Sequence, residues 1–193
     1  MRTIKIFSFL LILTAVSIAQ TKWEFDKSHT KVGFSVSHLV ITDVDGLFKD
    51  YSGTVTTQGD DFSTAKVDFS INTASISTEN EGRDKHLRSD DFFNAEKFPQ
   101  MTFKSKSMKK VNDKNYKLIG DLTIRDVTKQ VELDVRFNGM VKDPWANTKA
   151  GFKTSGEINR FDFNLKWNNT IETGGLVVGK EVTLKIDLQL KKS

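Results

Sequence analysis

The sequence predicts an all-β domain, a closed antiparallel β-barrel of about eight strands with one short helix inserted mid-chain. Apolar and polar residues alternate with period two along most of the chain, which is typical of strands with one buried and one solvated face. Only the stretch 83–98 departs toward helical spacing. The chain has no cysteine, so disulfides cannot protect open sheet edges, whereas closing the sheet removes them. We therefore favour a barrel over a two-sheet sandwich, with an interior that is filled by side chains or holds one slender ligand.

The first 19 residues have the pattern of a secretory signal peptide. Arg2 and Lys5 precede an apolar run over 6–18, and the small residue Ala19 marks a plausible cleavage point. We expect residues 20–193 to form one mature domain that is periplasmic or secreted. No other apolar run approaches the roughly 20 residues that a spanning helix needs, so no transmembrane segment is expected.

The alternation places the strands along the rest of the chain. We expect them at 23–25, 32–40, 47–58, 66–71, 101–111, 116–124, 131–137, around 152–158, and at 182–190. A turn at 112–115 makes a hairpin of the two strands around it. The stretch 160–180 is rich in Asn and Gly and is expected to be irregular.

The helical stretch begins among acidic residues, which suit a helix N-terminus. It cannot extend past Phe98, because Pro99 disfavours a helical conformation in the residue before it. Leu87, Phe92 and Phe93 share one side of it. A helix with such a face needs apolar surface to cover, and either the open end of a barrel or the seam between two sheets would supply it.

Composition and motifs argue against several function classes. Without Arg2 and Lys5 the formal net charge falls from +4 to +2, which gives no support for nucleic-acid binding. The histidines, His29, His38 and His86, form no spaced metal motif. The sequence has no nucleophile elbow, phosphate-binding loop or dinucleotide fingerprint. We therefore expect no enzyme, no metal and no cofactor.

The strands carry more inward apolar positions than a small barrel needs to fill its interior, and the chain has 15 phenylalanines. Packing alone is the simpler explanation, but an apolar tunnel for a chain-like lipid would use this surplus. The predicted ligand-binding residues are Phe34, Val36, His38, Phe69, Ile71, Leu87, Phe92, Phe103, Leu122, Leu133, Val135, Phe137, Phe152, Leu184 and Ile186. His38 shares the inward face of its strand, where it would be a hydrogen-bonded core residue or a ligand contact.

The order and spacing of many short motifs resemble the YceI-like family of exported, lipocalin-like, polyisoprenoid-binding proteins, over Trp23 to Lys192. The landmarks are Trp23-Glu24-Phe25-Asp26 with His29, Val32-Gly33-Phe34-Ser35-Val36, Gly46-Leu47-Phe48, Arg83-Asp84-Lys85-His86-Leu87, Phe98-Pro99 with Thr102-Phe103, Gly120-Asp121-Leu122-Thr123-Ile124, and Arg160 with Asp162-Phe163. The chain departs from the family pattern at Thr30, Asp126 and Asn164. Asp and Asn are the non-glycine residues that best tolerate positive φ, so the last two changes should preserve the backbone conformation.

This resemblance implies non-covalent binding of a long-chain lipid without established catalysis, and it leaves a homodimer open. It does not decide among an isoprenoid quinone, a prenyl phosphate and a fatty acid or its amide. A charged head group would need a polar partner at the mouth, and Arg83, His86 and Arg88 are the candidates.

Two other functions stay open. An enzyme acting on a lipid-like substrate could use the cluster Arg83, Asp84 and His86, or the pair Asp26 and His29, although such clusters usually bond to the backbone. Alternatively, a barrel filled by its own side chains could bind a protein through its outer surface.

Overall fold

The structure is a computed structural model that describes residues 19–170 and 175–193. The strands are β1 (Gln20–Phe25), β2 (Lys31–His38), β3 (Thr42–Phe48), β4 (Tyr51–Gln58), β5 (Asp61–Asn72), β6 (Ile76–Ser77), β7 (Gln100–Lys110), β8 (Asn115–Ile124), β9 (Val127–Lys142), β10 (Thr148–Asn159) and β11 (Val178–Lys192). The helices are the 3-10 turns η1 (Thr73–Ser75) and η2 (Arg160–Phe163) and one α-helix, α1 (Glu81–Arg88).

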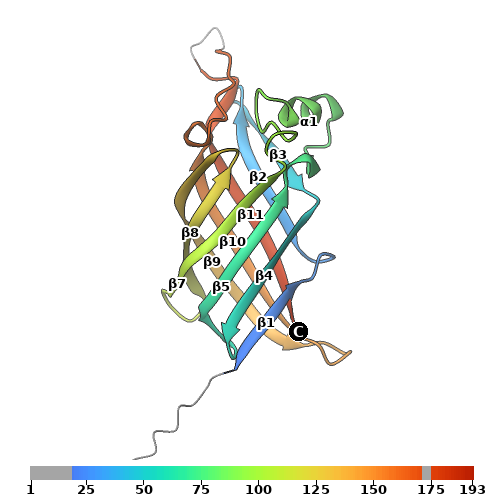
Figure 1. Ribbon diagram of the computed structural model, residues 1–193, viewed down its shortest axis with the longest axis vertical. Coiled ribbons are helices and arrows are strands. Elements are labelled where there is room, and N and C mark those ends of the chain that lie inside the picture. Colours follow the sequence, from blue (N-terminus) through green and yellow to red (C-terminus); the bar gives the residue numbers. More distant parts are fainter. Residues whose placement is uncertain (1–18, 171–174) are drawn as a thin grey trace, which may run out of the picture.

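Eight of these strands form a closed ring in the order β1-β4-β5-β7-β8-β9-β10-β11, and β1 pairs back onto β11. All pairings are antiparallel. The long strand β11 has two successive neighbours along one edge, because Leu190 pairs with Phe25 of β1 and Ile186 pairs with Val32 of β2. The predicted closed antiparallel barrel is therefore confirmed. Figure 1 shows it as elongated, with α1 at one end.

The inward side chains form two clusters along the barrel. One gathers around Trp23 and Phe152, and the other around Val32 and Phe163. The residues that pack against both clusters are Phe25, Phe69, Leu122, Val131 and Leu184. The barrel interior is therefore apolar from one end to the other.

The strand expected at 47–58 is two strands. It is interrupted at Lys49 and Asp50, where β3 pairs with β6 and β4 pairs with β5. Asn72 donates its backbone N–H to the carbonyl of Asp50 at 2.9 Å, which holds this corner of the sheet. The prediction missed the corner because hydrophobic alternation continues on both sides of it.

The strand expected at 32–40 ends at His38. Leu39 and Val40 adopt left-handed conformations, with φ of 53° and 63°, and the N–H of Ile41 returns to the carbonyl of His38 at 3.2 Å. These residues form a hairpin turn between β2 and β3, and Val40 points into solvent rather than inward.

The helix is shorter than the helical spacing suggested. It starts after Asn80, whose side chain accepts from the N–H of Arg83 at 2.9 Å, as a helix N-cap does. It ends at Arg88, because both the N–H and the hydroxyl of Ser89 bond to the carbonyl of His86. Phe92 and Phe93 follow in turns outside the helix.

Of the two substitutions expected to carry positive φ, one does. Asn164, at the end of η2, has φ of 62°, whereas in the hairpin between β8 and β9 the positive φ lies at Arg125 and not at Asp126. Except for Ala19, the predicted signal peptide lies outside the described residues. Among the described residues, no helix is long and apolar enough to cross a membrane.

Candidate ligand-binding cavity

The barrel encloses a cavity of about 210 Å³. Among the described residues, 35 line it, and of these only Thr154 and Arg160 carry polar side chains. Residues of both core clusters contribute to its wall, from Leu190 in one cluster to Leu165 in the other. An apolar wall of this length suits a chain-like molecule and offers almost nothing to hydrogen-bond one.

Most of the residues predicted to contact a ligand line this cavity. They are Phe34, Val36, Phe69, Ile71, Leu87, Phe92, Phe103, Leu122, Leu133, Val135, Phe152, Leu184 and Ile186. Their side chains come from seven of the strands and from the segment around α1. The alternation therefore located the cavity wall, and contact with a ligand remains a prediction.

His38 and Phe137 do not line the cavity, contrary to expectation. His38 is the last residue of β2, where the strand leaves the barrel wall. Phe137 precedes a β-bulge in the pairing of β9 with β10, between Gly151 and Phe152. Its ring packs 5.5 Å from that of Phe62 and 5.2 Å from that of Phe152, outside the cavity wall.

These aromatic rings close the barrel end that is remote from α1. Phe62 and Phe152 border the cavity with ring centroids 4.8 Å apart. Trp23 is fully buried beyond them, 5.0 Å from Phe62, and its indole N–H donates to Thr57 Oγ1 at 2.9 Å. The polar atom of the largest buried side chain is thus satisfied, and this end of the cavity is sealed.

The segment around α1 forms the opposite wall of the cavity, with Leu87, Phe92 and Phe93 turned inward. Arg125 fastens it to the barrel, because its Nη1 donates to the carbonyls of Phe92 at 2.9 Å and Asn164 at 3.3 Å. The wall at this end of the cavity therefore consists of side chains from a short, irregular segment and not from a long helix.

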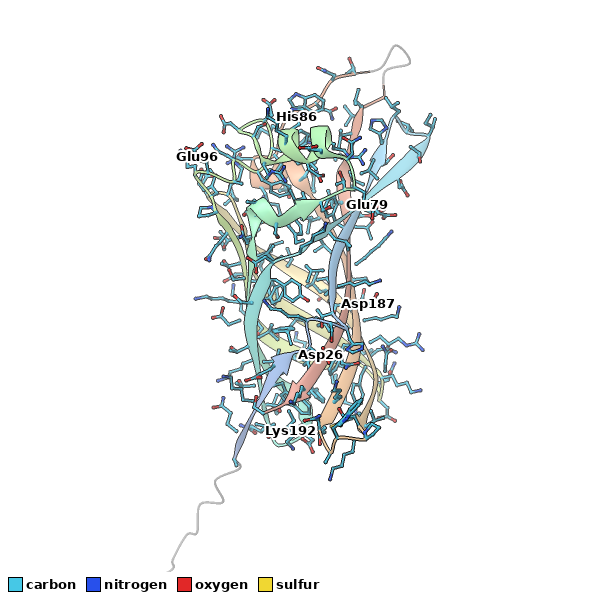
Figure 2. The ribbon with its side chains drawn as sticks, turned by 90° about the vertical axis from the view of Figure 1, so that its right-hand side faces the viewer. Asp26, Glu79, His86, Glu96, Asp187 and Lys192 are labelled. Carbon is cyan, nitrogen blue, oxygen red and sulfur yellow. The ribbon has the colours of Figure 1, made fainter. Side chains whose placement is uncertain are left out.

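The three candidate head-group residues lie at this end but do not line the cavity. Arg83 bonds to Thr78 through its Nε at 2.7 Å and Nη2 at 2.9 Å. Arg88 donates to the carbonyl of Ile76 at 3.4 Å. His86 bonds to Asp91 at 2.8 Å, and Figure 2 shows it at the α1 end, far from Asp26 and Lys192. Their partners give all three a structural role.

Arg160 was missed as a site residue. It is only 3% exposed, lines the cavity, and donates to the carbonyls of Gly179 at 2.8 Å, Trp167 at 2.9 Å and Val178 at 3.0 Å, as well as to that of Leu165. Burial lowers the pKa of its guanidinium, which nevertheless stays protonated in proteins. No carboxylate of the described residues forms an ion pair with it.

The signal for Arg160 in the sequence was weak, because an arginine is almost never fully buried unless paired. Its hydrogen-bond partners are the backbone carbonyls of Leu165 and Trp167 and those of Val178 and Gly179 at the start of β11, which the fold brings to η2. In the described part of the chain, no group of three or more His, Asp or Glu side chains could hold a metal ion.

A closed antiparallel barrel around one apolar cavity defines the lipocalin-like class of β-barrel. Within that class, this chain belongs to the YceI-like family, since the YceI-like domain model matches residues 23–190. A curated relative, a UPF0312 protein of Staphylococcus aureus strain N315, is 36% identical over 174 residues, which are 90% of this chain and 99% of the relative.

Solved structures agree with this assignment. The YceI protein of Campylobacter jejuni is 38% identical, with a TM-score of 0.71 over 87% of this chain and 96% of that chain. BcnA of Burkholderia cenocepacia, at 22% identity, has a TM-score of 0.75 over 86% and 99%. A polyisoprenoid-binding domain from Saccharophagus degradans shares the fold at 15% identity, with a TM-score of 0.68 over 89% and 98%.

Proposed function

We propose that this protein binds one long-chain lipid, a polyisoprenoid such as a quinone or a prenyl phosphate or another long acyl chain, inside the barrel, for transport or storage. The observation that carries the proposal is the cavity wall, in which 33 of the 35 described residues have no polar side chain. Ten buried methylene groups would contribute about 8 kcal/mol before the cost of association.

Two features support one orientation of the chain. The aromatic rings around Phe62 seal one end, whereas the only buried cation on the wall, among the described residues, is Arg160 at the other end. The apolar tail would then point toward Phe62 and the polar end toward Arg160. The predicted wall residues that line the cavity are the proposed contacts.

The alternatives have less support. In the enzyme hypothesis, Arg83 and Asp84 would converge with His86, yet both bond to Thr78 while His86 bonds to Asp91. A filled core does not fit the cavity of about 210 Å³. We therefore propose a binding protein without catalysis, exported after removal of residues 1–19, with 20–193 as one domain. The export proposal rests on the sequence alone.

Native mass spectrometry of the protein from its exported fraction, followed by organic extraction, tests the proposal. We expect a stoichiometric isoprenoid or acyl lipid. The proposal fails if the protein is empty and also refuses quinones, prenyl alcohols and fatty acids when they are offered. Absence of the protein from the exported fraction would contradict only the proposed localisation.

A further inference from the structure

The turn between β2 and β3 exposes large apolar side chains to solvent. We call Leu39–Ile41 the rim turn. Val40 is 66% exposed and Ile41 is 83% exposed. In Figure 1 the turn lies at the α1 end of the barrel, away from the sealed end. Two neighbouring apolar residues with so little cover contribute nothing to the core of the barrel.

The same residues are also poorly suited to their backbone conformation. A β-turn in which both central residues have positive φ favours Asn-Gly, because side chains branched near the backbone clash there. Here the central residues are Leu39, with φ of 53°, and the β-branched Val40, with φ of 63°. The strained backbone and the exposed apolar side chains of the turn both lower the stability of the fold. Strained residues of this kind are typical of functional sites.

The rim turn is joined directly to the cavity wall. Val36, two residues before the end of β2, lines the cavity. The N–H of Leu39 donates to the carbonyl of Val177 at 2.9 Å, and the next residue, Val178, lines the cavity and accepts from Arg160. A partner or surface in contact with the rim turn would therefore lie close to the end of the cavity at which we place the polar group of the ligand.

We propose that the rim turn inserts into the surface of a lipid bilayer and so brings the cavity to the place where its ligand enters and leaves. This inference rests on the proposed lipid-binding function. A bilayer fits better than a protein partner, because one turn is far smaller than the interface that a stable protein complex needs. Insertion of so few apolar side chains is weak and reversible, as a carrier requires.

The opposite end offers a control surface. Trp145, in the turn between β9 and β10, is 79% exposed, and Val141, near the end of β9, is 65% exposed. Docking through that turn would leave the bilayer next to the sealed end of the cavity. Trp167, in contrast, packs against His86 and Phe92 at the α1 end, so its fluorescence serves as a probe of bilayer contact at that end.

The test compares Val40→Asn/Ile41→Ser with wild type and with Trp145→Ser. We expect the rim variant to keep its thermal midpoint or to raise it, since Asn tolerates a left-handed conformation better than Val. It should retain a preloaded lipid in the absence of vesicles as wild type does, yet transfer it to phosphatidylcholine vesicles at least tenfold more slowly. Trp145→Ser should transfer at the wild-type rate.

Vesicles with brominated acyl chains locate the contact. In a Trp145→Phe background, quenching should fall on Trp167 and disappear with the rim substitutions. Transfer at the wild-type rate by the rim variant, or quenching confined to Trp145 in the unmodified protein, would overturn the inference. Because retention is measured without vesicles, a wild-type protein that never holds lipid would instead contradict the proposed function. If the double variant unfolds, Ile41→Ser alone replaces it in both measurements, because Ile41 is not one of the two residues with positive φ.

Discussion

Arg160 donates a hydrogen bond from Nη2 to the carbonyl oxygen of Val178 at 3.0 Å, and both residues line the cavity. This bond joins η2 to the start of β11 and places a buried positive charge on an otherwise apolar wall. Carbonyl dipoles stabilise the guanidinium in the described structure, but no carboxylate there neutralises it. A ligand with an anionic end would supply the missing charge.

The first prediction concerns that charge. Wild type should bind a long-chain fatty acid about tenfold more tightly than the alcohol of the same length, a difference of about 1.4 kcal/mol. The preference should be present at neutral pH and should decline as the acid's carboxyl group is protonated at lower pH. Fluorescence displacement titrations of the acid and the alcohol across pH measure it.

Arg160→Met should abolish this preference and still bind both lipids, while Arg160→Lys should keep part of it. If Arg160→Met does not fold, the pH series on wild type still tests whether the preference for the acid depends on its ionised carboxyl group. Equal affinities for acid and alcohol at neutral pH would show that Arg160 serves only to hold the backbone carbonyls to which it donates.

The second prediction concerns the sealed end. Ala65 is buried in the cluster around Trp23 and lines the cavity, whereas the next residue, Lys66, faces solvent. Ala65→Leu should shorten the longest chain that the barrel accepts and leave shorter chains unaffected. Each lost pair of methylene contacts should reduce affinity roughly tenfold.

A series of fatty acids of increasing length, titrated against Ala65→Leu and wild type, measures this effect. Lys66→Leu is the matched control, because it makes the same side chain on the outer face of the same strand. A uniform loss of affinity at every chain length would argue that the tail does not point toward Ala65.

The third prediction concerns pH and the link between β1 and β2. Asp26 accepts from Lys149 Nζ at 2.8 Å and from Gln189 Nε2 at 2.9 Å, and its side chain is 14% exposed. The hydrogen bond from Lys149, followed by that from Ser28, holds the pKa of Asp26 well below its usual value. The folded state therefore binds this proton less readily than the unfolded state, and ionised Asp26 stabilises the fold.

Asp26→Asn should accordingly lower the free energy of unfolding by about 2 kcal/mol at pH 7. The difference from wild type should shrink as the pH falls below about 4, the unfolded pKa of aspartate. Urea denaturation at pH 7 and pH 3.5 measures it. Asp187→Asn, which breaks an exposed ion pair with Lys153, should cost less than about 0.5 kcal/mol at either pH. A pH-independent loss in Asp26→Asn would contradict the argument.

The sequence predicted the cavity wall well because side-chain alternation is a local property of a strand. Leu184 and Ile186 illustrate this, since both line the cavity from β11. Phe137 obeys the same alternation and packs inward, but its ring lies against Phe62 and Phe152 at the closed end of the barrel and does not line the cavity. Where the cavity ends along the barrel depends on how rings from several strands pack together, which a single strand's pattern does not contain.

Arg160 and Val40 show the other limit of sequence reasoning. The guanidinium of Arg160 donates to four backbone carbonyls, and only the tertiary fold brings these carbonyls to it. They belong to Leu165, Trp167, Val178 and Gly179. Val40 continues the apolar alternation of β2, although the strand has already turned. Arginine is usually exposed and valine is usually buried, but the fold buries Arg160 and exposes Val40.

The last prediction uses the pairing of Phe34 with Gly46 across β2 and β3. The Phe34 ring lies so close over Gly46 that a Cβ there would overlap its Cζ and Cε1 atoms. Phe34 lines the cavity, so in Gly46→Ala its ring can swing into empty space. The free energy of unfolding should stay within about 1 kcal/mol of wild type, since alanine also restricts the unfolded chain.

Lipid affinity, in contrast, should fall in Gly46→Ala, because the displaced ring occupies the ligand's volume. Gly120→Ala provides the contrast, since a Cβ there would meet the backbone carbonyl of Lys104 as well as the Phe103 ring. A carbonyl in a paired strand cannot move aside, and we expect a loss of about 1–3 kcal/mol of stability. Adding Phe34→Leu to Gly46→Ala should restore lipid binding, as judged by calorimetric titration. Failure of that rescue, with a well-folded double variant, would mean that the Phe34 ring does not control the volume available to the lipid.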